Sequence, residues 1–180
     1  MPLAVNGSSA FYPTAQAEAA SYHASCPVAF FSVGSSSSGE GLRMLESGGV
    51  QIADSELSAR EAGFPDAGLA EHRVALIVFT MILNGSVTGV HSLSRDQVTA
   101  IYSGTISNWR TVGGPDLPIT AVGRPADSGT HAAFIRFVLD APEKPVGLVE
   151  SGTGEVIDRV RGTPGAIGRA SCRERVFSSV

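Results

Sequence analysis

Short apolar runs alternate along this chain with helix-like stretches, and loops of small and hydroxyl-bearing residues join them. Strands are predicted over five runs: 3–5, 28–33, 50–53, 74–83 and 117–122. The longest of them, 74–83, is a continuous apolar run broken at Thr80, which is typical of a buried strand. Helices are predicted over four stretches: 14–22, 42–47, 95–103 and 132–139. Strand, loop and helix in repeated order indicate an α/β protein with parallel strands, whose ligands gather at the strands' carboxyl ends.

One helix start is especially well marked. Ser94 and Gln97 have the spacing of a capping box, in which each side chain satisfies the other residue's backbone N–H. Leu93 can pack against Val98 as a hydrophobic staple, and Gly104 supplies the stop. We therefore expect a helix directly after Ser94.

A second helix start carries candidate chemistry. Arg124 is followed four residues later by Ser128, Gly129 and Thr130, which lead into the apolar pattern of 132–139. The first N–H groups of a helix have no intrahelical partner and carry partial positive charge, so they suit an oxyanion. The guanidinium of Arg124 can add a fork of donors. The alternative is an ordinary N-cap with a surface arginine.

A loop of small and hydroxyl-bearing residues precedes a predicted helix at two further places. The stretch 34–41 contains four consecutive serines before the helix predicted at 42–47, and Gly7, Ser8 and Ser9 precede the helix that follows Pro13. Three such loops in one chain indicate that several helix ends surround one anion.

Composition narrows the function classes. The 180 residues suffice for one large domain or two small lobes, and a hydrophobic content of 43% supports a core. A formal net charge of −4 argues against a general nucleic-acid binder, which would present a basic face. No apolar run reaches the roughly 18 residues that a membrane-spanning helix needs. We find no secretory signal at the first residue, and Cys26 and Cys172 define neither a disulfide framework nor a metal site.

Several well-known chemistries do not fit the motifs. Gly34 and Gly39 have P-loop spacing, but Glu40 stands where the lysine is required. Met44 stands where a dinucleotide fingerprint needs its third glycine, and the serine loop lacks a Gly-x-Ser-x-Gly elbow. The four histidines have no ligand spacing, so we expect no metal and no cofactor.

The block 101–119, followed by Arg124 and the Ser128-Gly129-Thr130 tripeptide, resembles the phosphate-binding proteins of bacterial phosphate ABC importers. The similarity extends from Gly7 to about Gly168. It implies a two-lobed type II periplasmic-binding-protein fold, with residues 1–77 in lobe I and 78–166 in lobe II. It also implies a monomer, exported to the periplasm or cell surface, that binds inorganic phosphate between the lobes, delivers it to a membrane permease and catalyses no reaction.

The resemblance assigns phosphate ligands residue by residue. It places Ser9, the backbone of Ala10 and Ser38 of the serine loop in the phosphate site, together with the residues of the motif that begins at Arg124. That motif contributes Arg124, Ser128, Gly129 and Thr130. The family's acidic acceptor is an aspartate after the third strand, and this chain has Glu56 at the aligned position. The acceptor is therefore left open between Glu56 and Asp54.

A carboxylate that accepts a hydrogen bond from the ligand would determine which anion the site prefers. Hydroxyls, arginine and backbone N–H groups donate to any tetrahedral oxyanion, but only a carboxylate can accept the proton of HPO4²⁻. Sulfate would set an unprotonated oxygen against the carboxylate, at a cost of a few kcal/mol. The sequence therefore predicts a preference for phosphate over sulfate.

The chain's last residues depart from the family. Members continue after Pro164–Gly168 with an aromatic residue and then complete the first lobe, whereas 169–180 resembles a sequencing adapter translated in frame. We assign 167–180 to a non-native tail and expect an incomplete first lobe. Two further functions stay open: a sensor or binding protein for another oxyanion, and a phosphate-ester hydrolase with a serine nucleophile. The hydrolase lacks a recognisable histidine or lysine base.

Overall fold

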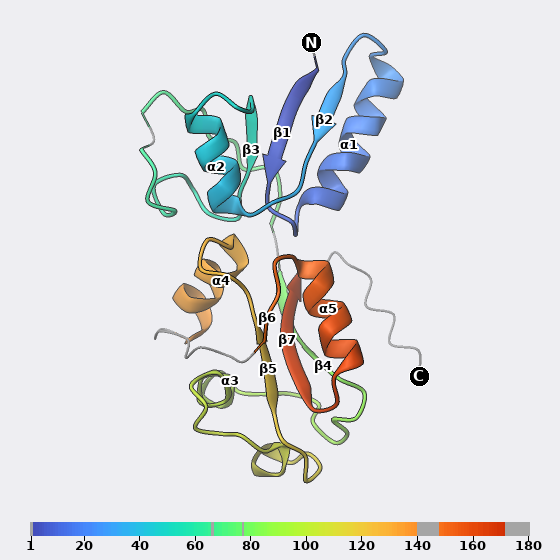
Figure 1. The fold of residues 1–180 in the computed structure, drawn as a ribbon, viewed down its shortest axis with the longest axis vertical. Coiled ribbons are helices and arrows are strands. Elements are labelled where there is room, and N and C mark those ends of the chain that lie inside the picture. Colours follow the sequence, from blue (N-terminus) through green and yellow to red (C-terminus); the bar gives the residue numbers. More distant parts are fainter. Residues whose placement is uncertain (1, 66, 77, 140–147, 172–180) are drawn as a thin grey trace. The chain divides into compact units, whose positions relative to one another are not determined.

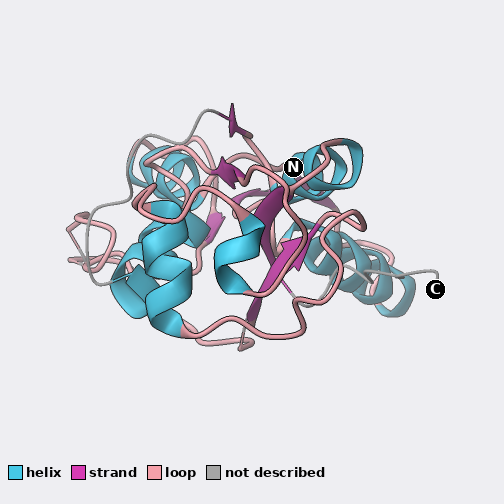
Figure 2. Ribbon diagram, turned by 90° about the horizontal axis from the view of Figure 1, so that it is seen from below, coloured by secondary structure: helices cyan, strands magenta, loops and turns pink. Residues whose placement is uncertain are grey.

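In the computed structural model of the chain, residues 2–65, 67–76, 78–139 and 148–171 are described. They belong to two compact units, whose helices and strands are distinguished by colour in Figure 2. Unit 1 contains the residues up to Leu76 together with the segment Ala126–Ala132. Unit 2 contains the residues from 78 to Pro125 and those from Ala133 onward.

Unit 1 is a small parallel α/β layer (Figure 1). Its elements in chain order are β1 (Leu3–Gly7), α1 (Tyr12–Ser25), β2 (Phe31–Val33), α2 (Ser38–Glu46) and β3 (Ile52–Asp54). The strand order is β2-β1-β3, and β1 pairs in parallel with both neighbours. The three carboxyl ends therefore lie at one edge of the sheet, as the alternating pattern predicts.

Glycines let α2 approach this sheet closely. A Cβ atom at Gly41 would lie 2.6 Å from the Cα of Gly7 and 2.7 Å from the carbonyl oxygen of Asn6. Contacts that short do not occur for a real side chain, so the helix can pack onto β1 only with glycine here. The N-terminus of α2 is fixed in this way beside the end of β1.

Unit 2 is built on a mixed sheet with the strand order β4-β7-β5-β6. Its elements are β4 (Phe79–Leu83), α3 (Arg95–Tyr102), the 3-10 turn η1 (Trp109–Val112), β5 (Thr120–Gly123), the π-helical turn η2 (Ile135–Leu139), β6 (Leu148–Val149), α5 (Thr153–Gly162) and β7 (Ala166–Ser171). Helix α4 (Gly129–Phe134) begins in the unit 1 segment and continues into unit 2.

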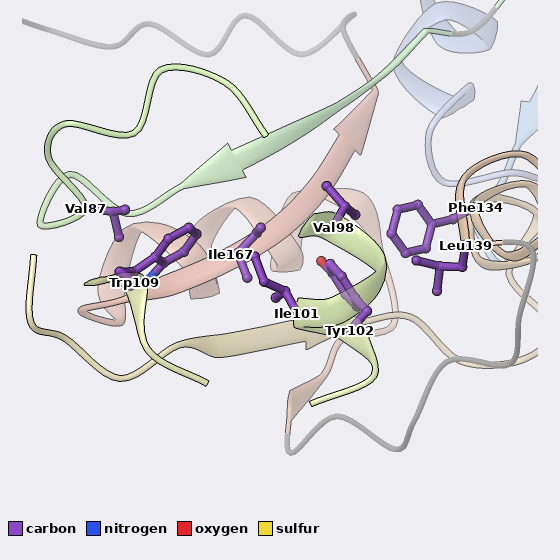
Figure 3. Packing of buried hydrophobic residues seen from close by; sticks show 8 residues of the cluster. All are labelled: Val87, Val98, Ile101, Tyr102, Trp109, Phe134, Leu139 and Ile167. Carbon is purple, nitrogen blue, oxygen red and sulfur yellow. The ribbon is translucent and has the colours of Figure 1, made fainter. Parts of the chain in front are cut away.

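The core of unit 2 gathers around Trp109 and Tyr102, which are 0% and 1% exposed (Figure 3). The indole Nε1 donates to the carbonyl oxygen of Gly165 at 2.9 Å. The ring of Tyr102 meets Phe134 edge-on with centroids 4.9 Å apart. The block 101–119, which carries the family resemblance, is thus largely a packing motif of this unit.

The prediction for 74–83 is partly wrong. Only Phe79–Leu83 forms a strand, while Val74, Leu76 and Val78 are 75%, 97% and 61% exposed. The pairing of β4 with β7 begins at Phe79, opposite Ser171, so the apolar residues before it lie outside the ladder. This pairing is antiparallel, whereas the alternating pattern predicted parallel strands.

Residues 167–171, assigned above to a non-native tail, lie in β7, and residues 172–180 with Cys172 lie outside the described residues. Arg169 is 1% exposed, and its guanidinium carbon lies 4.3 Å from the centroid of the Phe134 ring. In the described parts of the chain, no helix has the length and apolar character needed to cross a membrane.

Candidate functional site

Three hydroxyl groups of unit 1 converge on the carboxylate of Glu56. The Oγ of Ser8 donates to Glu56 Oε1 at 2.7 Å, and Oγ1 of Thr130 donates to the same oxygen at 3.2 Å. The Oγ of Ser38 donates to Oε2 and also accepts from the backbone N–H of Glu56 at 3.3 Å. Ser8, Ser38 and Thr130 are each no more than 2% exposed. The cluster is therefore a buried set of hydroxyl donors around one acceptor.

The parallel topology of unit 1 explains why these residues meet. Ser8 directly follows β1, Ser38 follows the loop after β2, and Glu56 lies two residues after β3. A bridge between Ser8 and Ser36 extends the pairing of β1 with β2, and the backbone N–H of Ser8 donates to the carbonyl oxygen of Asp54 at 2.8 Å. The strand ends are thereby held in register.

Serine hydroxyls also accept backbone N–H bonds where the helices begin. Ser37 Oγ accepts from the N–H of Glu40 at 3.1 Å at the start of α2, and Ser128 Oγ accepts from the N–H of His131 at 3.3 Å at the start of α4. Ser8 Oγ accepts from the N–H of Phe11 at 3.2 Å, just before α1. The three loops singled out in the sequence are thus helix entrances, as expected.

Gly129 permits the closest approach in the cluster. A Cβ atom at this position would overlap Glu56 Oε2 and Ser38 Oγ, so any larger residue would displace the carboxylate or the hydroxyl. Gly129 is also the first residue of α4. Its role is to bring the helix start against Glu56.

Of the two candidate acceptors, Glu56 receives the hydrogen bonds from all three hydroxyls. Asp54 ends β3 and participates through its backbone, which accepts from Ser8. Burial raises the pKa of the Asp54 carboxyl above its ordinary value of 3.8. The geometry therefore favours Glu56 as the acceptor.

The first loop places Ser8 against Glu56, and Ser9 and Ala10 follow it in the chain. The family resemblance names Ser9 in this loop as a phosphate ligand, and the structure shows its neighbour Ser8 donating to Glu56. Ser9 lies in the following turn, and Ala10 is buried at 3% exposure before α1. Of the expected ligands in unit 1, the structure brings Ser38, Glu56, Gly129 and Thr130 together, and Ser128 caps the same helix.

Arg124 lies in unit 2, directly after β5. It is 4% exposed, and its Nη1 donates to Thr153 Oγ1 at 3.1 Å while Nη2 donates to the carbonyl oxygen of Ser151 at 2.8 Å. Thr153 is the first residue of α5, so the guanidinium lies against the start of that helix. Two bonds to a buried hydroxyl and a carbonyl fix its orientation.

Sequence reasoning missed both Ser8 and Thr153. A signal for Thr153 was present, because Ser151-Gly152-Thr153 repeats the tripeptide of 128–130. The Val156 and Val160 spacing of i and i+4 after it is typical of a buried helix face. For Ser8 the adjacent hydroxyls of Ser8 and Ser9 give no local means of choosing between them.

The arrangement suits a small oxyanion better than a metal. Hydroxyls donate, and one carboxylate accepts, which matches a tetrahedral anion that carries a proton. Within the described ranges, no group of three His, Cys, Asp or Glu side chains is placed to hold a metal ion.

Comparison with known proteins gives consistent matches. The model of a family described as the PBP superfamily domain matches residues 2–175. The phosphate-binding protein PstS of Bacillus subtilis (strain 168) is 38% identical over 167 residues, which cover 92% of this chain. The chain spans 55% of the length of that protein.

Solved structures resemble the chain as well. A Clostridium perfringens protein, whose crystal structure contains bound phosphate, matches with a TM-score of 0.85 and 30% identity over 100% of this chain and 72% of that one. An ABC-type phosphate transport receptor from Vibrio cholerae matches with a TM-score of 0.69 and 26% identity, covering 94% of this chain and 70% of that one.

Proposed function

Because the chain belongs to the PBP superfamily, we propose that it is an exported protein that binds inorganic phosphate and delivers it to a membrane ABC permease. The observation that carries the proposal is the convergence of the Ser8, Ser38 and Thr130 hydroxyls on Glu56. The names of the similar proteins from Bacillus subtilis and Vibrio cholerae support the choice of ligand.

The chemistry of the cluster supports phosphate in particular. Each hydroxyl can turn its proton from Glu56 toward a ligand oxygen by rotation about its C–O bond. Glu56 can then accept the proton of HPO4²⁻, which sulfate lacks at neutral pH. The proposal includes Ser9, Ala10, Arg124 and Ser128 as ligands because the family resemblance assigns them, and it keeps Asp54 as the alternative acceptor to Glu56.

A thermal melt of the full chain tests this function. Phosphate at about 100 times its dissociation constant should raise the free energy of unfolding by about 2.7 kcal/mol, and sulfate at the same concentration should leave it unchanged. Ser38→Ala should abolish the phosphate shift because it removes a buried donor. Ser35→Ala, in the same loop but exposed, is the matched control and should keep it.

Two results would contradict the proposal. A cooperative melt that ignores phosphate would reject phosphate binding by this chain. Equal shifts with phosphate and sulfate would reject the role of Glu56 in anion choice.

A further inference from the structure

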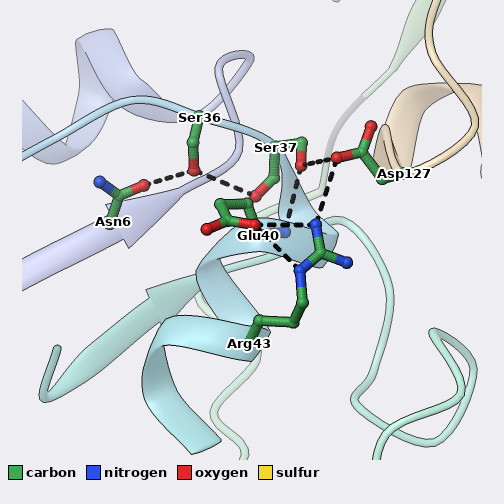
Figure 4. Close-up of polar contacts among 6 residues, drawn as sticks. All are labelled: Asn6, Ser36, Ser37, Glu40, Arg43 and Asp127. Atoms are coloured by element: carbon green, nitrogen blue, oxygen red, sulfur yellow. Dashed lines mark hydrogen bonds and ion pairs between the residues drawn. The ribbon is translucent and has the colours of Figure 1, made fainter. Parts of the chain in front are cut away.

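Asp127 joins the segment that precedes α4 to the start of α2 through three contacts within unit 1, and Figure 4 draws the two that its side chain makes. Its Oδ2 accepts from Ser37 Oγ at 2.8 Å and lies 3.4 Å from Nη2 of Arg43. Its backbone carbonyl oxygen accepts from the N–H of Gly39 at 3.2 Å. Backbone and side chain of one residue thus hold the same helix terminus.

The contacts form a closed ring. Ser37 Oγ, which donates to Asp127, accepts from the N–H of Glu40, and the Glu40 side chain accepts from Nε of Arg43 at 2.9 Å. Ser37 is 6% exposed, whereas the side chains of Arg43 and Asp127 are 50% and 40% exposed. Solvent and salt screen the ion pair, so the bond to the buried Ser37 hydroxyl is the stronger restraint.

Gly39 lets the two segments come this close. A Cβ atom there would lie 3.1 Å from the Asp127 carbonyl oxygen and 3.4 Å from the Asp127 Cβ. Ser38, which follows Ser37, and Thr130, three residues after Asp127, both donate to Glu56. The Asp127 contacts therefore lie one and three residues away from two donors of the candidate site.

We propose that Asp127 is a positioning residue that fixes the segment Ser128–Thr130 against α2, so that the hydroxyls of Ser38 and Thr130 meet at one point. Asp127 acts through Ser37 and Gly39, and the anion does not touch it. This inference rests on the proposed function for its effect on phosphate affinity, but the contacts of Asp127 with Ser37 and Gly39 form without a ligand.

The charge of Asp127 gives a sharp test. A carboxylate close to an anion site repels the anion, so a purely electrostatic role predicts tighter binding when the charge is removed in any way. A positioning role predicts that the acceptor oxygen matters and the charge does not. Asp127→Asn keeps an acceptor for Ser37, and Asp127→Ala removes it.

Phosphate titration by calorimetry of the full chain should therefore separate the variants. Asp127→Ala should weaken phosphate binding at least tenfold, whereas Asp127→Asn should stay within about threefold of the unaltered chain. Asp158→Ala, which removes an exposed aspartate paired with Arg161 in unit 2, is the matched control. In a Ser37→Ala background, Asp127→Ala should cause less than a twofold further loss, because the shared bond is already gone.

Amide hydrogen exchange of the ligand-free chain supplies a readout that does not depend on phosphate. Asp127→Ala should speed exchange in 128–132 and at Gly39, and Asp127→Asn should do so much less. Unchanged exchange and unchanged affinity in Asp127→Ala, or equal losses in both variants, would overturn the proposal. If the unaltered chain fails to bind phosphate, the proposed function is rejected. The exchange result alone then decides whether Asp127 holds the segment Ser128–Thr130 against α2.

Discussion

The hydroxyl of Ser8 donates a 2.7 Å hydrogen bond to Oε1 of Glu56, which joins the end of β1 to the loop after β3. The same hydroxyl accepts from the N–H of Phe11 while its own proton points toward the carboxylate. The bond therefore couples the entrance of α1 to the acceptor of the candidate site. An oxyanion that receives the Ser8 proton must compete with Glu56 for it.

The selectivity of binding should depend on Glu56 more than on Asp54. Glu56→Gln replaces an acceptor with an amide that can also donate, so sulfate should bind nearly as well as phosphate. Asp54→Asn should leave the preference for phosphate in place, since the three hydroxyls contact Glu56. Calorimetric titration of each variant with both anions measures the ratio of dissociation constants.

The double variant, with both residues changed to amides, is the control for this assignment. It should behave like Glu56→Gln alone. Selectivity that survives in the double variant would show that neither carboxylate chooses the anion. Relaxation in Asp54→Asn alone would transfer the role to Asp54.

Several helix starts could be predicted because their signals are local, whereas Ser38 and Glu56 are assigned as ligands through the family resemblance. A capping box depends on residues three apart, and Ser94 with Gln97 forms the predicted one at the start of α3. Ser128 caps the predicted helix for the same reason. Ser38 could be placed at a helix start because glycine and serine before an apolar pattern indicate an entrance.

Other features depend on contacts between distant parts of the chain. The position of Ser8 beside Glu56 depends on its bridge to Ser36 and on its bond to Asp54, which no local pattern specifies. The strand predicted at 28–33 shortens to Phe31–Val33, and Val28 and Phe30 are 85% and 60% exposed. Apolar character gives a segment the capacity for burial, but the available partners decide whether it is buried.

Gly129 should tolerate no side chain. Gly129→Ala would push a methyl group into Glu56 Oε2 and Ser38 Oγ, and overpacking of this kind costs about 1–3 kcal/mol. Phosphate affinity should fall at least tenfold. Thermal melts and phosphate titration measure the two effects.

The matched control is Gly154→Ala in α5. A Cβ at Gly154 meets nothing within 4 Å, and alanine is favoured over glycine in a helix by up to about 1 kcal/mol. This variant should therefore be as stable as the unaltered chain or slightly more so. Equal destabilisation by both substitutions would contradict the account of Gly129.

Arg124 should resist replacement even by lysine. Lysine cannot reproduce the two directed bonds to Thr153 Oγ1 and the Ser151 carbonyl oxygen, so Arg124→Lys should lose about 1–3 kcal/mol of stability together with phosphate binding. Urea unfolding and titration measure these losses. Arg161→Lys, at an exposed ion pair with Asp158, is the control and should change stability by less than about 0.5 kcal/mol.

The stability of the ligand-free chain should depend on pH through Asp54. Its folded-state pKa is raised by burial, so the folded chain holds this proton at pH values where the unfolded chain has released it. The stability that the protonated carboxyl contributes is complete below its ordinary value of 3.8 and is lost as the pH rises through the raised value. Asp54→Asn cannot lose a proton, so its melting temperature relative to the unaltered chain should increase from pH 4 to pH 7. Melts in phosphate-free buffers measure this difference, and a difference that stays constant or shrinks with pH would show that burial does not raise the pKa of Asp54.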